Sequence, residues 1–224
     1  IGKWGGDLTS WMSWQWKRGA GFDVVAYQGD GVAGRQINHS MNNSVDMIWT
    51  KRRSPAAGWR VWHKGLNGGG SNAATYYLSL NETTAQTSNG DIYGSSSGIL
   101  PTSTHWTVGS NAAVNESGSD FISMLFSSVE GISKVGEFDG SSSDVTLTTG
   151  FTPRFIIIKS TTHAQNWCVF DTLRSLGSSG NDKLLKLNSS AAESAANTDY
   201  VNTTATGFVV KSGQSAETNG GSTY

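Results

Sequence analysis

The sequence contains an internal repeat, which restricts the fold more than any other feature. The block Val45–Lys51 resembles Pro153–Lys159, and further blocks follow in the same order in both halves. The other matched pairs are Val61–His63 with Val169–Asp171, Leu78–Asn81 with Leu185–Asn188, His105–Val108 with Gly207–Val210, 109–119 with 211–222, and Phe121 with Tyr224. Each pair is separated by a little over one hundred residues. This spacing predicts repeats of whole-domain size rather than the short units of a solenoid.

The N-terminal end extends the repeat. Trp11–Trp16 resembles Phe121–Phe126 at a similar separation. We therefore assign residues 1–21 to the last strand and linker of a preceding repeat, 22–130 to a first repeat and 131–224 to a second repeat. The second repeat stops where its own final strand is expected, so we expect this chain to be a piece of a longer one.

Short apolar segments separated by turn residues indicate the fold class. Asp46–Thr50 and Arg154–Lys159 have the length of strands, and Phe121–Phe126 is apolar on both faces, as a central strand is. The connecting segments are rich in Gly, Asn and Ser, which tolerate turn conformations. We predict an all-β fold with two tandem β-sandwich domains of jelly-roll type. The only segment with helical composition is Ala191–Asn197.

Composition excludes several classes of protein. Only 15% of residues are charged and the net charge is −1, which argues against nucleic-acid binding and against binding to anionic membranes. No run of apolar residues is long enough for a membrane-spanning helix, so we expect no membrane insertion. The single Cys excludes an intrachain disulfide framework. A surface dominated by Gly, Ser, Thr and Asn fits an exposed, hydrogen-bonding protein.

Catalytic and metal-binding motifs are not found in the sequence. It has no GxSxG nucleophile motif, and its four His residues do not form an HxxxH or HExxH motif. The carboxylate pair Glu137 and Asp139 has no counterpart in the first repeat. The loop Asp139–Asp144 loosely resembles a calcium loop but lacks the EF-hand pattern, so a turn is favoured and calcium remains the alternative. We predict no catalytic residues, no metal site and no cofactor.

A basic and aromatic cluster is the strongest candidate for a binding site. Cations beside indole rings can form a stacking platform for a sugar or an anionic glycan. The competing interpretation is that the Trp side chains alternate into the core while the cations cap strand ends. The cluster consists of Lys51, Arg52, Arg53, Trp59, Arg60, Trp62 and His63.

The Trp-rich opening is a second unusual feature. Trp4, Trp11, Trp14 and Trp16 lie within the first sixteen residues, and the strand expected there has aromatic side chains on both faces. We expect such a strand to be covered on both sides, by its own sheet and by a neighbouring domain or subunit.

Two longer blocks carry a family resemblance. Gly150–Lys159 followed by Trp167–Arg174 resembles a repeated domain of unknown function in the virion proteins of marine tailed phages, cyanophages included. Lys186–Ser190 and Thr206–Val210 fit the same pattern, whereas Trp62–Leu66 departs from it in the first repeat. The matched motifs are strand and turn signatures, and the resemblance supplies no catalytic residues.

This resemblance implies a virion structural protein, located on the surface of an extracellular particle. We expect a segment of a phage tail fibre or similar appendage that attaches to the host through multivalent, non-catalytic binding. Its expected partners are further copies of itself, with a trimer favoured, other virion proteins, and a host-surface glycan or protein receptor. The alternatives are an architectural protein for capsid decoration or tail assembly and, less favoured, a glycan-binding or depolymerase module.

Overall fold

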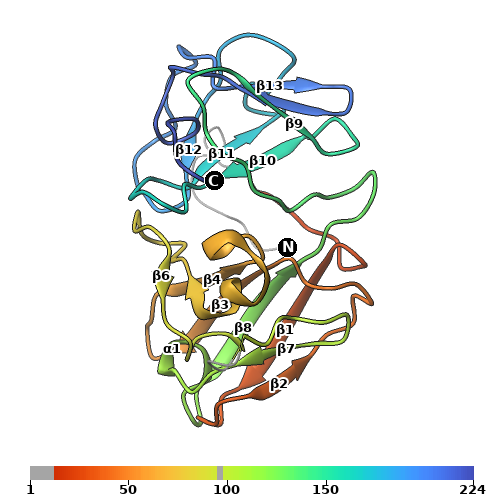
Figure 1. The fold of residues 1–224 in the computed structure, drawn as a ribbon, viewed down its shortest axis with the longest axis vertical. Coiled ribbons are helices and arrows are strands. Elements are labelled where there is room, and N and C mark those ends of the chain that lie inside the picture. The colour runs from red at the N-terminus through yellow and green to blue at the C-terminus, as the bar shows by residue number, and fades with distance from the viewer. Residues whose placement is uncertain (1–12, 95–97) are drawn as a thin grey trace, which may run out of the picture.

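The computed structural model describes residues 13–94 and 98–224, which form short strands in several antiparallel sheets with very little helix. Figure 1 shows two bodies stacked along the long axis of the molecule, with β3 and β4 of the first facing β10 and β11 of the second. This confirms the all-β class. None of the helices in the described part of the chain has the length and apolarity that crossing a membrane requires.

The first body is organised around a four-stranded antiparallel sheet in the order β1-β8-β3-β4. Its strands are β1 (Phe22–Gln28), β8 (Asp120–Phe126), β3 (Met47–Ser54) and β4 (Trp59–His63). Two short pairs, β2-β7 and β5-β6, accompany it. The remaining elements are β2 (Arg35–Asn38), β5 (Tyr76–Tyr77), β6 (Thr87–Ser88), β7 (His105–Val108), the 3₁₀ helices η2 (Leu66–Gly68) and η3 (Gly70–Thr75), and α1 (Ala112–Asn115).

The second body contains two three-stranded antiparallel sheets, β10-β11-β12 and β13-β14-β9. Their strands are β9 (Val145–Thr148), β10 (Phe155–Ile158), β11 (Cys168–Asp171), β12 (Leu185–Lys186), β13 (Val201–Thr204) and β14 (Gly207–Val210). In Figure 1 the C-terminal end lies on the side of this body that faces the first one.

Residues that the sequence repeat aligns make the same strand pairings in both bodies. Val61 pairs with Leu78 in the first body, and their counterparts Val169 and Leu185 pair in the second. The pairing of β2 with β7 likewise corresponds to that of β9 with β14. The first residue of β2 pairs with Val108, and the first residue of β9 pairs with the aligned Val210. The sequence repeat is therefore also a repeat of sheet connections.

A stacked aromatic pair recurs as well. The rings of Tyr27 and Phe121 stack with their centroids 5.2 Å apart, and those of Phe138 and Tyr224 stack at 4.9 Å. Phe121 and Tyr224 are the residues that the repeat aligns. Each pair joins the start of its repeat to the end of the same repeat, which closes each body with the same contact.

Each body has its own apolar core, because alternate side chains of its strands point inward. In the first body, Ile48, Trp62, Trp106 and Leu125 are almost completely buried. In the second, the central residues come from β10, β11, β13 and β14 and are Ile156, Ile158, Phe170, Val201 and Val210.

The expectation of helical structure at Ala191–Asn197 is wrong, because this segment forms no helix. Helical composition alone does not offset the cost of the first turn, so a segment this short forms a helix only where its surroundings support it. Tertiary contacts hold the segment instead: Ser194 donates its backbone N–H to Leu184 O at 3.0 Å, and Glu193 forms ion pairs with Arg174 and Lys183.

Candidate functional site

The basic and aromatic cluster divides between the two faces of the β1-β8-β3-β4 sheet. Lys51 and Trp59 are directly opposite on β3 and β4, and Lys51 Nζ lies 6.0 Å from the centroid of the Trp59 ring. Trp62 points to the other face, where it is 2% exposed and its Nε1 donates to Ala73 O at 3.0 Å. Trp62 therefore belongs to the core and lies apart from any surface that Lys51 and Trp59 form.

Three further members of the cluster are occupied by contacts within the protein. Arg60 lies 5.2 Å from the Tyr77 ring centroid, and Arg52 forms an ion pair with Glu116. His63 Nδ1 accepts a hydrogen bond from Gly65 N at 3.0 Å, and burial together with the nearby Lys64 lowers the pKa of His63 to about 4.

Lys51, Arg53 and Trp59 are the members of the cluster that reach solvent, although Lys51 Nζ also donates to Ala57 O. Arg53 is exposed at the end of β3, and Lys51 and Trp59 are partly exposed. A binding role for these three residues remains a prediction.

An apolar interface joins the two bodies. Trp167, which precedes β11, is 3% exposed and packs into the core of the first body, where its Nε1 donates to Ser79 O at 3.0 Å. Ile157 and Leu187 pack against the same core. The two bodies therefore share apolar contacts in addition to the covalent linker.

Polar contacts border this interface. Lys159 is 5% exposed, and its Nζ donates to Thr83 O at 3.1 Å in the first body and to Ser160 O at 2.8 Å. Burial lowers the pKa of Lys159 to about 8. Gln86 donates its backbone N–H to Thr161 O at 2.8 Å, which adds a second link between the bodies.

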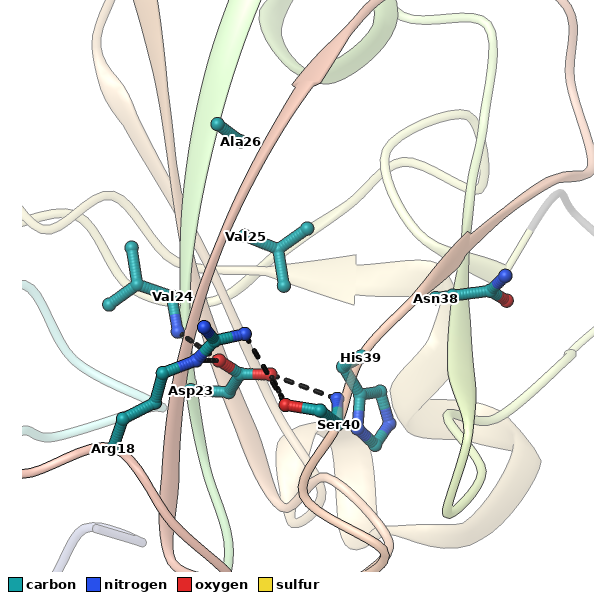
Figure 2. A pocket seen from close by; sticks show the side chains of 8 residues that line it. All are labelled: Arg18, Asp23, Val24, Val25, Ala26, Asn38, His39 and Ser40. Carbon is teal, nitrogen blue, oxygen red and sulfur yellow. Dashed lines mark hydrogen bonds and ion pairs between the residues drawn. The ribbon is translucent and has the colours of Figure 1, made fainter.

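A buried carboxylate fastens the N-terminal linker to the first body. Figure 2 shows Arg18 and Ser40 converging on Asp23 of β1, whose side chain is completely buried. Arg18 forms an ion pair with this carboxylate, Ser40 donates its N at 2.9 Å and its Oγ at 3.0 Å, and Val24 donates its N at 2.8 Å. Burial alone raises the pKa of Asp23, but these donors outweigh it and lower the pKa to about 2.

Replacing Asp23 by asparagine should lower the free energy of unfolding by about 1–2 kcal/mol at pH 7, an amount reduced because Arg18 is largely exposed. The pKa of Asp23 in the folded protein lies below the usual value of about 3.9 for an unfolded chain. The stabilisation is therefore complete above about pH 4 and is lost as the pH falls toward about 2. Urea unfolding at pH 7 and at pH 3, with the exposed Glu130→Gln as control, measures this difference. An equal gap between wild type and D23N at both pH values would contradict the assignment.

A cavity of about 870 Å³ lies between the bodies. Its walls are mainly apolar and include β10, the end of β8 and the segment 131–138. Such a lining suits an apolar occupant better than a charged one. The ionisable side chains in the lining are mostly basic: Lys17, Arg18, His63, Lys134, Arg154 and Lys159, with the acidic Glu137. The apolar residues of the second body that line it include Phe138, Leu147, Phe151, Phe155, Ile156, Ile157, Ile158, Trp167, Phe208 and Tyr224.

The Trp-rich opening lies beside this cavity. The described residues 13–16 form no strand. Trp14 Nε1 donates to Asp171 Oδ2 at 3.3 Å, and Arg174 Cζ lies 5.8 Å from the centroid of the Trp14 ring. Trp16 packs edge-on against Phe155 and Phe126 with centroids 5.9 and 6.1 Å apart. Trp16 therefore contacts both bodies but remains 39% exposed, so the expectation of a strand covered on both sides is wrong for residues 13–16. Trp4 and Trp11 lie outside the described residues.

A family model for a domain of unknown function, DUF7483, matches residues 3–224. The chain belongs to this family. No curated protein and no solved structure matches it. The DUF7483 match covers both bodies together, and the description of the family names no activity.

The carboxylates of the candidate calcium loop are engaged within the DUF7483 chain itself. Asp139 Oδ1 accepts from Thr223 Oγ1 at 2.9 Å. Asp144 forms an ion pair with Lys211 and accepts from Ser212 N at 2.9 Å, and these donors lower the pKa of Asp144. Within residues 13–94 and 98–224, no group of three His, Cys, Asp or Glu side chains could hold a metal ion. These contacts favour the turn interpretation of the loop.

Sequence reasoning missed two buried asparagines that occupy equivalent places in the DUF7483 repeat. Asn115 is completely buried and Asn219 is 3% exposed. Asn115 Nδ2 donates to Gly109 O just after β7, and Asn219 Nδ2 donates to Val210 O at the end of β14. Both lie in the matched linkers 109–119 and 211–222. The signal that could have revealed them is an Asn near the end of each linker.

Proposed function

We propose that the chain is a structural segment of a phage tail fibre or similar virion appendage, and that it binds the host surface without catalysis. The observation that supports a structural role is the apolar interface through which Trp167, Ile157 and Leu187 lock the two repeats together. An appendage has to keep its repeats in fixed relative positions, and contacts of this kind meet that need. The virion location rests on the resemblance of the second repeat to virion proteins of marine tailed phages.

We further propose that each repeat is a β-sandwich of jelly-roll type, with limits at 22–130 and 131–224. In the first repeat, residues of β3 and β8 and residues of β2 and β7 contribute to one core. In the second, β10 and β11 contribute to the same core as β13 and β14. Two sheets that share one core are what a sandwich requires.

The hydrogen bonds of candidate catalytic groups favour a non-catalytic role. Asp171 is 5% exposed and is held by an ion pair with Arg174 at 2.7 Å. His39 Nδ1 accepts from Met41 N at 3.3 Å, and His163 Nδ1 lies 2.7 Å from Ser222 Oγ. Side chains used in this way stabilise turns and strand ends. His163 and Ser222 do bring a base within hydrogen-bond distance of a hydroxyl, but Ser222 is only 7% exposed, so that hydroxyl is not presented to a substrate.

The attachment surface that we propose is formed by Lys51, Arg53 and Trp59. The two cations provide charged contacts and the partly exposed indole provides a stacking contact, which suits an anionic sugar. A single site of this size binds weakly, so useful attachment requires several copies, as in a trimeric fibre. Further virion proteins would anchor such an assembly to the particle.

The test compares one copy with many copies of the full chain. Monomeric chain and chain clustered on streptavidin are measured for binding to purified bacterial lipopolysaccharides by biolayer interferometry. Clustering should raise the apparent affinity about 10²–10⁴-fold. The double variant Arg53→Ala with Trp59→Ala should abolish this gain. Leu173→Ala, which removes an 82% exposed side chain elsewhere, should leave it unchanged.

Three outcomes would contradict parts of this proposal. Release of oligosaccharides from the lipopolysaccharide would indicate a depolymerase. Clustered chain that binds neither lipopolysaccharide nor intact marine bacteria would favour the purely architectural role. If Leu173→Ala lost as much binding as the Arg53 and Trp59 double variant, the assignment of binding to the proposed surface would be wrong.

A further inference from the structure

The cavity between the bodies has the position that a central strand occupies in the first repeat. There, β8 lies between β1 and β3 and pairs with both of them. By the repeat, the counterparts of β1 and β3 are the segment 133–139 and β10. Within the described residues β10 pairs only with β11, so its other edge borders the cavity.

Neighbouring contacts outline a groove of one-strand width. The segment 133–139 makes ladder contacts only at its two ends, where Ser133 bridges to Val129 and Asp139 bridges to Thr223. In the first repeat the corresponding β1 is a seven-residue strand along β8. The side chains of Phe138, Ile156 and Ile158 line the groove, which makes it apolar.

The first residues of a strand in this groove are already in place. Thr161 N donates to Thr223 O at 2.8 Å on one side. On the other side, Phe138 and Tyr224 exchange two backbone hydrogen bonds of 3.0 and 2.9 Å. The two residues together thus bond to both neighbours, Thr223 to Thr161 and Tyr224 to Phe138, at the place where Asp120 and Phe121 start β8. The backbone at Tyr224 is therefore directed along the groove.

We propose that the groove is a strand-acceptor site, which takes one extended apolar strand continuing the path of Thr223 and Tyr224, antiparallel to β10. Strands of this kind bind through main-chain hydrogen bonds to both edges and through alternate side chains in pockets. The site does not depend on the virion role proposed above, since it follows from the strand pairings alone.

The register follows from β8. Leu125 pairs with Ile48 and Ser123 pairs with Thr50, whose counterparts in β10 are Ile156 and Ile158. The second and fourth residues after Tyr224 should therefore face the core of the second body, opposite Ile158 and Ile156. A large aliphatic side chain is required at the fourth position, because Leu125 is completely buried at the corresponding place.

The chain's own segment 13–16 is a poorer occupant. Tyr224 fills the position that the repeat assigns to the first residue of such a strand. Trp14 contacts Phe155, the first residue of β10, and its indole donates to Asp171 and lies near Arg174. Segment 13–16 therefore crosses the start of β10 and does not run along the edge of that strand. A second copy's strand would have to displace Trp16, which contacts Phe155 at the edge of the groove.

The experiment extends the full chain beyond Tyr224 by Ile-Ser-Met-Leu-Phe, the sequence of residues 122–126. The matched control carries Ile-Ser-Met-Asp-Phe. The leucine extension should slow amide hydrogen exchange of Ile157 at least about tenfold, since an edge amide becomes part of a three-strand ladder. The aspartate extension should leave exchange unchanged, because its fourth residue would place a charge in the core.

A cross-link checks the register. In a Cys168→Ala background, Ile158→Cys should form a disulfide with a cysteine at the second appended position, and Ile156→Cys should not, because directly opposite residues are close enough to join. Equal exchange in the two extensions, or a disulfide only to position 156, would overturn the proposal. Concentration-dependent dimers of the unextended chain with protected Ile157 amides would also overturn it, since a second copy would then fill the groove.

Discussion

Replacing Trp167 by alanine should lower the free energy of unfolding by about 3–5 kcal/mol, the usual cost of removing a buried aromatic side chain. The indole is 3% exposed and packs into the core of the first repeat although it belongs to the second. The substitution also leaves Ser79 O without its donor at 3.0 Å. Because the residue links the bodies, the loss should appear as separate unfolding of the two repeats as well as lower stability.

Differential scanning calorimetry measures both effects. Wild type should unfold in one transition and Trp167→Ala in two. The matched control is Trp59→Ala, which removes the aligned residue of the first repeat. Trp59 is only partly buried, so its loss should cost less and leave one transition. A single transition for Trp167→Ala, or equal losses for both variants, would show that the interface does not couple the repeats.

The strands were predictable where the sequence pattern is simple. Asp46–Thr50, Arg154–Lys159 and Phe121–Phe126 are apolar runs between turn residues, and they became β3, β10 and β8 within a few residues. Ala74–Leu80 alternates like a strand, and Tyr76–Tyr77 form β5 with Leu78 bridging to Val61, but Ala74 and Thr75 belong to η3. The Gly and Asn residues before it permit a tight 3₁₀ turn, and only tertiary packing decides between the two structures.

The candidate binding cluster shows a different limit. Residues close together in sequence on a strand point to opposite faces, so Trp59 and Trp62 separate although they are near neighbours. Charge and aromatic content alone do not reveal which face is core. The cavity was not predictable at all, because it depends on how the edge of β10 and the segment 131–138 meet in space.

Asn115 shows what single-sequence reasoning overlooks, because an Asn in a Gly- and Ser-rich linker resembles an ordinary turn residue. Its Oδ1 accepts from Asp30 N at 3.1 Å. Its Nδ2 lies 3.0 Å from each of Asp30 Oδ1, Val32 O and Gly109 O. One completely buried amide at the end of α1 therefore joins the loop after β1 to Gly109, directly after β7.

Replacing Asn115 by alanine should cost about 2–4 kcal/mol, since it leaves several buried polar groups without partners at about 1–3 kcal/mol each. Asn219→Ala should cost less. Its Oδ1 accepts from Ser141 N at 2.6 Å, but its Nδ2 donates to only two carbonyls, Ser143 O at 3.0 Å and Val210 O at 3.4 Å. Urea unfolding of the two variants gives the order directly.

Asn111→Ala is the matched control for Asn115, because it removes an Asn from the same linker. Asn111 caps α1 by accepting from Ala113 N at 2.9 Å, and loss of such a cap costs about 1 kcal/mol. Asn115→Ala should therefore be the more damaging of the two by about 1–3 kcal/mol. If the two variants were equally stable, the buried amide of Asn115 would contribute no more to stability than the cap residue Asn111. If the predicted order holds, both repeats depend on an asparagine at the same place, because a side-chain amide can accept from one loop and donate to another where the backbone cannot reach.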